Sequence, residues 1–161
     1  MNKYVFDLTK IHPDFRIGKK SRIASKKIKL YKGIRRDALI NNHVYSMALR
    51  NDRKEHIEEV KTIIESGNRE EIRKLFDRHT SHYHYTALIS ASPNYEIAQR
   101  FANHISKREN VETMICEIRI DSNRFVYDSF GFSNGGFRGE ALILGEIYPE
   151  EIKRCILNYK S

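Results

Sequence analysis

The chain has 161 residues, a net charge of +8 and a composition that is 40% hydrophobic and 11% aromatic. This length corresponds to one domain, and this composition can bury a core without metals or disulfides. No run of 18 apolar residues occurs, which excludes a membrane-spanning helix, and the first ten residues lack the apolar core of a cleaved secretory signal. We therefore expect a cytoplasmic protein, or one delivered into the cytosol of a target cell without such a signal.

The positive charge is concentrated at the N-terminal end of the chain. Residues 1–36 contain 12 Lys or Arg against Asp7 and Asp14, so they carry a net charge of +10, whereas the other 125 residues carry −2. Such a charge attracts polyanions, including nucleic acid and nucleotide phosphates. The alternative is a basic face that is merely solvated. The lysines concentrated there are Lys19, Lys20, Lys26 and Lys27.

The two cysteines, Cys116 and Cys155, both lie in apolar runs. A chain of this size with two such cysteines is unlike the disulfide-dense scaffolds of small secreted domains. The pattern therefore predicts free, buried thiols in a protein that works in a reducing compartment.

The first half of the chain is predicted to be basic and then helical. Residues 1–27 form a short apolar start followed by an irregular basic stretch, and the alternation in 28–31 predicts a strand. Apolar residues at helical spacing then predict a helical lobe over residues 37–77.

Capping residues divide this lobe into three helices. Asn51 or Asp52 is predicted to cap the second helix, and Asn68 with Glu71 has the spacing of a capping box at the start of the third.

The second half, residues 85–159, is predicted to be rich in strands. Ser92 and Pro93 predict a helix start, with Ser92 as the N-cap. That helix carries an apolar stripe of Ile97, Phe101 and Ile105. Helices that precede a mostly antiparallel set of strands indicate the α+β class. The expected strands are 85–90, 114–120, 125–127, 140–147 and 152–159.

Three short segments stand out from this pattern, in a fixed order along the chain. The first ends a strand with Tyr31-Lys32-Gly33. The second is Ser90-Ala91-Ser92, followed in its helix by Ala98-x-x-Phe101-Ala102. The third places Glu140 at the head of the most apolar strand.

The order and spacing of these segments resemble the mono-ADP-ribosyltransferase superfamily, the fold of the cholera- and diphtheria-type toxins, in its arginine–serine–glutamate branch. The likeness covers residues 28–157, and the middle segment is its most specific part. It implies a single domain of two packed, mostly antiparallel sheets with an N-terminal helical lobe and a central NAD cleft. It also implies a bacterial toxin or effector that transfers ADP-ribose from NAD+ to a macromolecule and releases nicotinamide, with no metal.

The resemblance gives each of these residues a role that fits the chemistry. Cleavage of the nicotinamide–ribose bond passes through an oxocarbenium-like ribose, which the Glu140 carboxylate would stabilise. Ser90 would hydrogen-bond Glu140 and fix its rotamer. Lys32 would bind a phosphate or ribose oxygen of NAD+, and Gly33 would let its backbone approach the nicotinamide amide. The other NAD-binding candidates are Tyr31 and Ser92, of which Ser92 also serves as a helix cap.

Two departures from the family pattern bear on this prediction. Position 32 is Lys where the branch has Arg, which keeps the charge but loses the planar five-donor fork. Arg138 stands where many members carry the Gln or Glu that helps select the acceptor, so arginine is not the expected acceptor. In the family the Gly-rich loop before the catalytic Glu recognises the acceptor, which makes Phe137 and Arg138 the candidates here.

Other functions remain open on the sequence alone. The same fold could be a catalytically inactive module that binds NAD or protein, or a nucleic-acid-binding module without NAD chemistry. A related transferase class uses NAD to remove a phosphate from RNA. It relies on additional Arg and His motifs, which we cannot assign to positions in this sequence. The acceptor of an active enzyme would be a host protein or nucleic acid.

Two further residue patterns compete with the proposed site. Glu146 lies on the same predicted strand face as Glu140, although its flanking residues fit a strand end better. His79, His82 and His84 suggest a metal site, but no cysteine is nearby and zinc needs three or four protein ligands. Their polar neighbours favour a loop.

Overall fold

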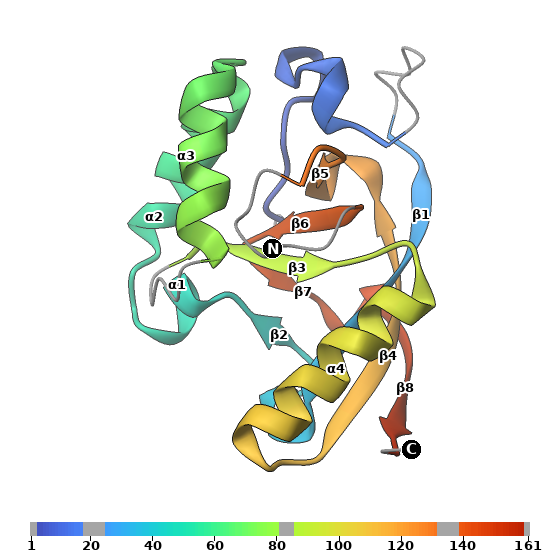
Figure 1. Cartoon of the computed structure of the whole chain (residues 1–161). Helices are drawn as coiled ribbons and strands as arrows, with labels where there is room; N and C mark the ends of the chain where they lie inside the picture. The colour runs from blue at the N-terminus through green and yellow to red at the C-terminus, as the bar shows by residue number, and fades with distance from the viewer. Residues whose placement is uncertain (1–2, 18–24, 81–85, 132–138, 160–161) are drawn as a thin grey trace.

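The computed structural model describes residues 3–17, 25–80, 86–131 and 139–159. These residues confirm the α+β class, with four α-helices and three antiparallel sheets (Figure 1). The α-helices are α1 (Met47–Arg50), α2 (Glu55–Glu65), α3 (Arg69–Thr80) and α4 (Tyr95–Glu109). The 3-10 helices are η1 (Leu8–Lys10), η2 (Pro13–Phe15), η3 (Arg36–Ala38), η4 (Ser122–Arg124) and η5 (Pro149–Glu151). The strands are β1 (Lys27–Arg35), β2 (Val44–Tyr45), β3 (Leu88–Ala91), β4 (Thr113–Asp121), β5 (Phe125–Asp128), β6 (Glu140–Leu144), β7 (Glu146–Ile147) and β8 (Ile152–Asn158).

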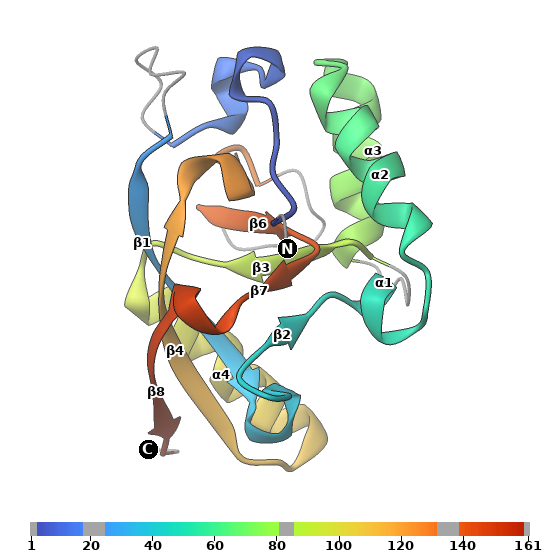
Figure 2. The same ribbon diagram turned by 180° about the vertical axis from the view of Figure 1, so that it is seen from behind.

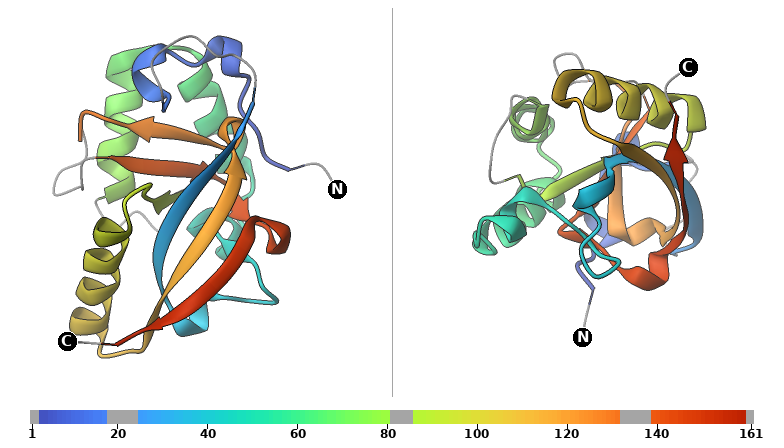
Figure 3. Two further views of the ribbon diagram at one scale, coloured as in Figure 1. Left: turned by 90° about the vertical axis from the view of Figure 1, so that its right-hand side faces the viewer. Right: turned by 90° about the horizontal axis from the view of Figure 1, so that it is seen from below.

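The strands of the described ranges form three sheets where the sequence predicted two. Two sheets have three strands each, in the orders β1-β4-β8 and β3-β6-β5, and a third pairs β2 with β7. The strands of the first sheet run steeply across those of the second (Figure 3). The predicted strand over 140–147 is divided between β6 and β7 because Gly145 between them adopts a positive φ of 80°.

The core lies between the two three-stranded sheets and on both outer sides of that pair. Leu30 of β1, Ile118 of β4 and Ile143 of β6 belong to one buried cluster between the sheets. The other face of β3-β6-β5 packs against α2, α3 and the N-terminal segment, and α4 covers β1 and β4 (Figures 1 and 2). None of the helices in these ranges combines the length and apolar character needed to cross a membrane.

The contact between α4 and β1 depends on Gly33. A Cβ atom at this position would lie 2.5 Å from the carbonyl oxygen of Ala98 and 2.8 Å from the Cβ of Ala102. Both contacts are closer than real Cβ atoms allow, and one is with helix backbone that cannot shift cheaply. The close packing of α4 on β1 thus explains why position 33 is a glycine. The predicted contact of Gly33 with nicotinamide stays a prediction.

The predicted helix at the start of the 37–77 lobe is wrong. Residues 36–46 form η3, a turn and β2, because Asn41 and Asn42 both adopt left-handed conformations with φ of 50° and 62°. Asparagine tolerates this conformation but a helix does not. Asn51 and Asp52 end α1 instead of starting α2, since Asn51 is the C-cap of α1 and Asp52 has a φ of 55°.

Capping at the other two helices is partly as predicted. At α3 the Asn68 side chain accepts a hydrogen bond from the Glu71 backbone N–H at 3.2 Å, as the capping-box spacing indicated. At α4 the N-cap is Asn94, whose side chain accepts from the Glu96 N–H, so the prediction of Ser92 as the N-cap is wrong. The Ser92 hydroxyl instead accepts from the Asn94 N–H, in the turn that precedes the helix.

The prediction of free thiols is also wrong, because Cys116 and Cys155 form a disulfide. The two residues are directly opposite each other in the antiparallel pairing of β4 with β8. Periodicity alone does not reveal this pairing, since it fixes the face of a strand but not its partner. The disulfide removes the argument from free thiols for a reducing compartment.

Reduction of this disulfide is expected to destabilise the fold. The bond closes a loop with a sequence separation of 39 residues, for which the loss of unfolded-state entropy is worth about 4 kcal/mol. Urea denaturation with and without dithiothreitol measures this difference in the free energy of unfolding. The Cys155→Ser variant is the control, because its stability should not respond to the reductant. Equal stability of the wild-type protein under both conditions would show that the bond does not form in solution.

Candidate functional site

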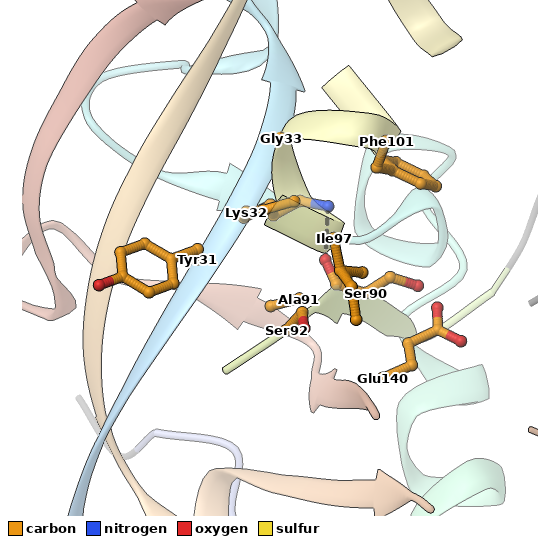
Figure 4. A pocket seen from close by; sticks show the side chains of 10 residues that line it. Tyr31, Lys32, Gly33, Ser90, Ala91, Ser92, Ile97, Phe101 and Glu140 are labelled. Atoms are coloured by element: carbon orange, nitrogen blue, oxygen red, sulfur yellow. Dashed lines mark hydrogen bonds between the residues drawn. The ribbon is translucent and has the colours of Figure 1, made fainter. Parts of the chain in front are cut away.

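A cleft opens where β1, β3, α4 and the start of β6 meet (Figure 4). It brings together six residues that the sequence predicted for catalysis or NAD binding, although they come from three distant segments. Ser90 is 58 residues from Lys32, and Glu140 follows after another 50. The residues that line the cleft are Tyr31, Lys32, Gly33, Ser90, Ala91, Ser92, Ile97, Ala98, Phe101 and Glu140.

The cleft forms where two sheets touch at a single bridge. The backbone N–H of Tyr31 donates to the Ser92 carbonyl at 2.7 Å, and the N–H of Ser92 donates to the Tyr31 carbonyl at 2.8 Å. Beside this bridge β1 continues with β4 as its partner while β3 pairs with β6. Because the two sheets diverge there, Lys32 of β1 and Ser90 of β3 line a cleft between them.

Lys32 is a cation on an apolar strand face. Strand alternation places it on the same face of β1 as Leu30 and Ile34, which belong to the core between the sheets. Its ammonium donates to the Ser90 carbonyl at 2.7 Å and lies 5.7 Å from the centre of the Phe101 ring. Burial lowers the pKa of Lys32 to about 8, partly offset by the negative charge of Glu140.

Ser90 is held by a histidine that the sequence analysis assigned to a loop. His79 lies in the last turn of α3, with Nε2 at 2.7 Å from Ser90 Oγ and Nδ1 at 2.7 Å from Thr86 Oγ1. Burial, and then the positive charge of Lys32, lower the pKa of His79 to about 4. The signal that could have found it is helical spacing, because His79 lies seven and three residues after the buried Ile72 and Phe76.

Glu140 begins β6 and is largely buried, with 9% of its surface exposed. It follows Gly139, whose positive φ of 82° turns the chain into the strand. Across the β5–β6 pairing its partner is Asp128, which is fully buried. Directly opposite residues of an antiparallel pair project to the same face, so a second carboxyl group that the sequence analysis missed lies beside Glu140.

The competing candidate, Glu146, lies in a different place. It belongs to β7, beyond Gly145, and is absent from the cleft lining. Its carboxylate is 2.8 Å from Nδ1 of His43, and it is 7% exposed. The break at Gly145 therefore separates the two glutamates that looked equivalent in the sequence.

Some predicted residues fall outside the described ranges, namely Phe137, Arg138, Lys19 and Lys20. The two basic residues that can be placed, Lys26 and Lys27, lie at the start of β1 and are exposed, away from the cleft. Lys27 Nζ is 3.3 Å from the Asp121 carboxylate, a surface ion pair of little energetic weight. Polyanion docking through these lysines stays a prediction.

The cleft is narrow at its inner end and joins a wider groove. The inner space measures about 20 Å³, room for about one water molecule. Tyr31 and Ile97 also line the outer groove, which measures about 710 Å³ and carries two further tyrosines, Tyr95 and Tyr127. The inner space is therefore too small for a ring-sized ligand.

No metal site is visible in the part of the chain that the structure describes, where no group of three or more His, Cys, Asp and Glu side chains is placed to hold an ion. His82 and His84 lie outside those ranges. Comparison with models of protein families, with curated proteins and with solved structures found no match to this chain.

The buried ammonium of Lys32 predicts a characteristic pH dependence of stability. Its pKa is about 8 in the folded chain against 10.5 as the ordinary value, so between these pH values the unfolded chain binds more protons. The free energy of unfolding should then rise by about 3 kcal/mol from pH 8 to pH 10.5 relative to a Lys32→Met variant. Urea denaturation of both proteins over this range measures the difference. A constant difference would mean that Lys32 titrates normally.

Proposed function

We propose that this chain is a mono-ADP-ribosyltransferase of the superfamily it resembles, a bacterial toxin or effector that acts in the cytosol of its target. It would transfer ADP-ribose from NAD+ to a macromolecular acceptor other than arginine. The observation that carries the proposal is the meeting of Lys32, Ser90 and Glu140 in one cleft. These are the residues of the three sequence segments that suggested the family.

The arrangement supports the chemistry of that reaction. The bond between C1′ of the ribose and the nicotinamide nitrogen breaks, its electron pair stays on the nitrogen, and neutral nicotinamide leaves without a general acid. The buried carboxylate of Glu140 stabilises the positive charge that develops on the ribose, and its position allows it to accept a hydrogen bond from the 2′-hydroxyl. A nucleophilic atom of the acceptor then forms the new bond to C1′.

Lys32 supplies the positive charge for the NAD+ phosphates or ribose. Its ammonium is already in the cleft and its hydrogen-bond partner is a backbone carbonyl, that of Ser90. An ammonium has three donors, so it can keep this bond while it turns another N–H toward a phosphate oxygen. The Lys in place of Arg therefore preserves the charge of the family residue, although not its bidentate geometry.

Binding of NAD+ requires the inner cleft to widen. The space of about 20 Å³ is too small for a nicotinamide ring, and the larger side chains that line it include Lys32, Ile97 and Phe101. Ile97 and Phe101 are only partly buried, whereas Ala98 and Ala102, which pack on Gly33 of β1, are buried. We expect rotation of the Ile97 and Phe101 side chains to widen the cleft while the two alanines keep α4 in contact with β1.

A second candidate function is a catalytically inactive module that binds NAD or nucleic acid on the same fold. The narrow inner cleft and the Lys at position 32 favour it. Hydrolysis of NAD+ by the purified protein separates the two functions, because water can replace the acceptor only if the bond to nicotinamide is broken.

The Glu140→Gln variant tests the enzyme directly. Loss of one charge-stabilising group lowers catalytic rates by about 10²–10³-fold, so we expect NAD+ hydrolysis to fall by that factor while NAD+ affinity and the melting temperature change little. Release of nicotinamide, followed by chromatography, measures the rate. The matched control is Glu146→Gln, which changes a buried carboxylate outside the cleft. Full activity of Glu140→Gln would overturn the assignment, and loss only in Glu146→Gln would transfer it to the other glutamate.

The acceptor is expected to carry negative charge near the modified atom. Arg138 would repel a guanidinium and attract a phosphate or carboxylate, and Phe137 would pack against the acceptor. Labelled NAD+ in a cell lysate, followed by nuclease or protease treatment, shows which fraction holds the label.

Salt dependence tests the N-terminal docking surface in the same assay. Transfer by a variant with alanine at Lys19, Lys20, Lys26 and Lys27 should be weaker and less sensitive to salt. ADP-ribose found on arginine by mass spectrometry would contradict the acceptor prediction. An unchanged salt dependence would show that these lysines do not dock a polyanion and only form a solvated basic face.

A further inference from the structure

His79 connects a helix to the strand that carries Ser90. Its ring is fixed at both nitrogens, with Nδ1 at 2.7 Å from Thr86 Oγ1 and Nε2 at 2.7 Å from Ser90 Oγ. Thr86 lies two residues before the start of β3, and Ser90 is within the strand. Since both hydroxyls belong to one short segment, the imidazole is locked in its plane and its two partners cannot move apart.

A neutral ring has one N–H, so the two contacts cannot both be donated by His79. Burial and the Lys32 ammonium lower the pKa of His79 to about 4, which keeps the ring neutral at physiological pH. Either Nδ1 donates to Thr86 and Ser90 donates to Nε2, or Thr86 donates to Nδ1 and Nε2 donates to Ser90.

The surroundings of the two hydroxyls select the second arrangement. Thr86 Oγ1 already accepts the backbone N–H of Leu88 at 3.3 Å. An N–H from Nδ1 would share the same oxygen, whereas the Thr86 hydrogen can be donated to Nδ1 without competition. The first arrangement would leave Ser90 Oγ able only to accept. It could not then pair with the Glu140 carboxylate, and the Lys32 ammonium already donates to the Ser90 carbonyl at 2.7 Å. The second leaves the Ser90 hydrogen free to be donated into the cleft.

We propose that His79 is a positioning residue that donates its Nε2–H to Ser90 Oγ and thereby directs the Ser90 hydrogen into the cleft, toward Glu140 or a ligand hydroxyl. The network runs from Thr86 through His79 to Ser90 and into the cleft. The effect of this network on catalysis rests on the proposed function. The tautomer of His79 can be determined whether or not the protein is an enzyme. The family resemblance suggested a hydrogen bond from Ser90 to Glu140, and His79 supplies the reason why the hydroxyl would point that way.

The same contacts also have the geometry of a nucleophile with its general base. A Ser–His pair at 2.7 Å, with a third group that orients the ring through its other nitrogen, is the arrangement expected for acyl transfer; here that third group is the Thr86 hydroxyl. However, a ring with a pKa of about 4 and a cation beside it is a poor proton acceptor at neutral pH, and Thr86 is no substitute for the carboxylate that stabilises an imidazolium. The environment makes His79 a fixed donor.

Nitrogen NMR of the ligand-free protein tests the tautomer. In ¹⁵N-histidine-labelled protein at pH 7 the two ring nitrogens have separate shifts, and the His79 signals are assigned by their loss in His79→Gln. We expect a protonated Nε2 and an unprotonated Nδ1. A protonated Nδ1 or a doubly protonated ring overturns the proposal. This measurement needs no activity, so it remains decisive if NAD+ is not a substrate.

A pair of variants tests the catalytic consequence. The amide of Gln reaches the place of Nε2, whereas that of Asn reaches only the place of Nδ1. We expect His79→Asn to lower kcat for NAD+ hydrolysis about tenfold with little change in KM, and His79→Gln to restore most of it at a similar melting temperature. Equal kcat values for the two variants would overturn the positioning role.

A double-mutant cycle and a chemical probe complete the test. In a Ser90→Ala background the His79→Asn change should have no further effect on kcat, because its partner is already gone. An additive loss would show that His79 acts elsewhere. Covalent labelling of Ser90 by a fluorophosphonate in the wild-type protein would show a base-activated nucleophile and would also overturn the proposal.

Discussion

The buried guanidinium of Arg124 links four segments of the chain that are distant in the sequence or separated by a break in a strand. Arg124 is 1% exposed, and its Nε donates to the Glu151 carboxylate at 3.0 Å. Its other donors reach the carbonyl oxygens of Leu144, at 3.0 Å, and of Tyr4 and Glu146. One side chain thus holds the N-terminal segment, the end of β6, β7 and η5 together. Loss of the guanidinium would remove a hydrogen-bond donor from three carbonyls and would leave the buried Glu151 carboxylate with the Tyr148 N–H and the more distant Lys3 ammonium.

This anchor determines which glutamate faces the cleft. Tyr4, which Arg124 holds, packs on Gly145, where a Cβ atom would lie 2.4 Å from the tyrosine ring. Gly145 has a left-handed φ of 80° and ends β6, so Glu146 turns away to His43. Arg124 holds the C-terminal end of β6 at Leu144, and Glu140 is the first residue of the same strand. The two glutamates therefore lie on opposite sides of the break at Gly145, Glu140 at the start of β6 and Glu146 in β7.

Sequence periodicity predicted the strands and the site to different degrees. Strong alternation located β4, because a local pattern determines which face of a strand is buried. The residues that line the cleft were predicted in another way, from three short segments whose order resembles that of a known family. The partner of Cys116 was not predictable in this way, since register across β4 and β8 is a long-range property. The turn at Asn41 requires a left-handed backbone conformation, which the spacing of apolar residues does not reveal. The last turn of α3 carries His79, whose contact with Ser90 is made between segments distant in the sequence and is equally invisible to local spacing.

Lys32 lowers the stability of the fold relative to an apolar side chain at the same place. A lysine among the side chains of Leu30 and Ile34 costs desolvation, as its lowered pKa shows, and a methionine would fill the same place without charge. The carbonyl of Ser90 accepts from this ammonium, while its hydroxyl contacts His79. One residue of β3 thus sets the positions of both a cation and a hydroxyl. Because β6 pairs with β3, the Glu140 carboxylate is held in register with them, so the three groups keep a fixed relation even when side chains of α4 move to admit a ligand.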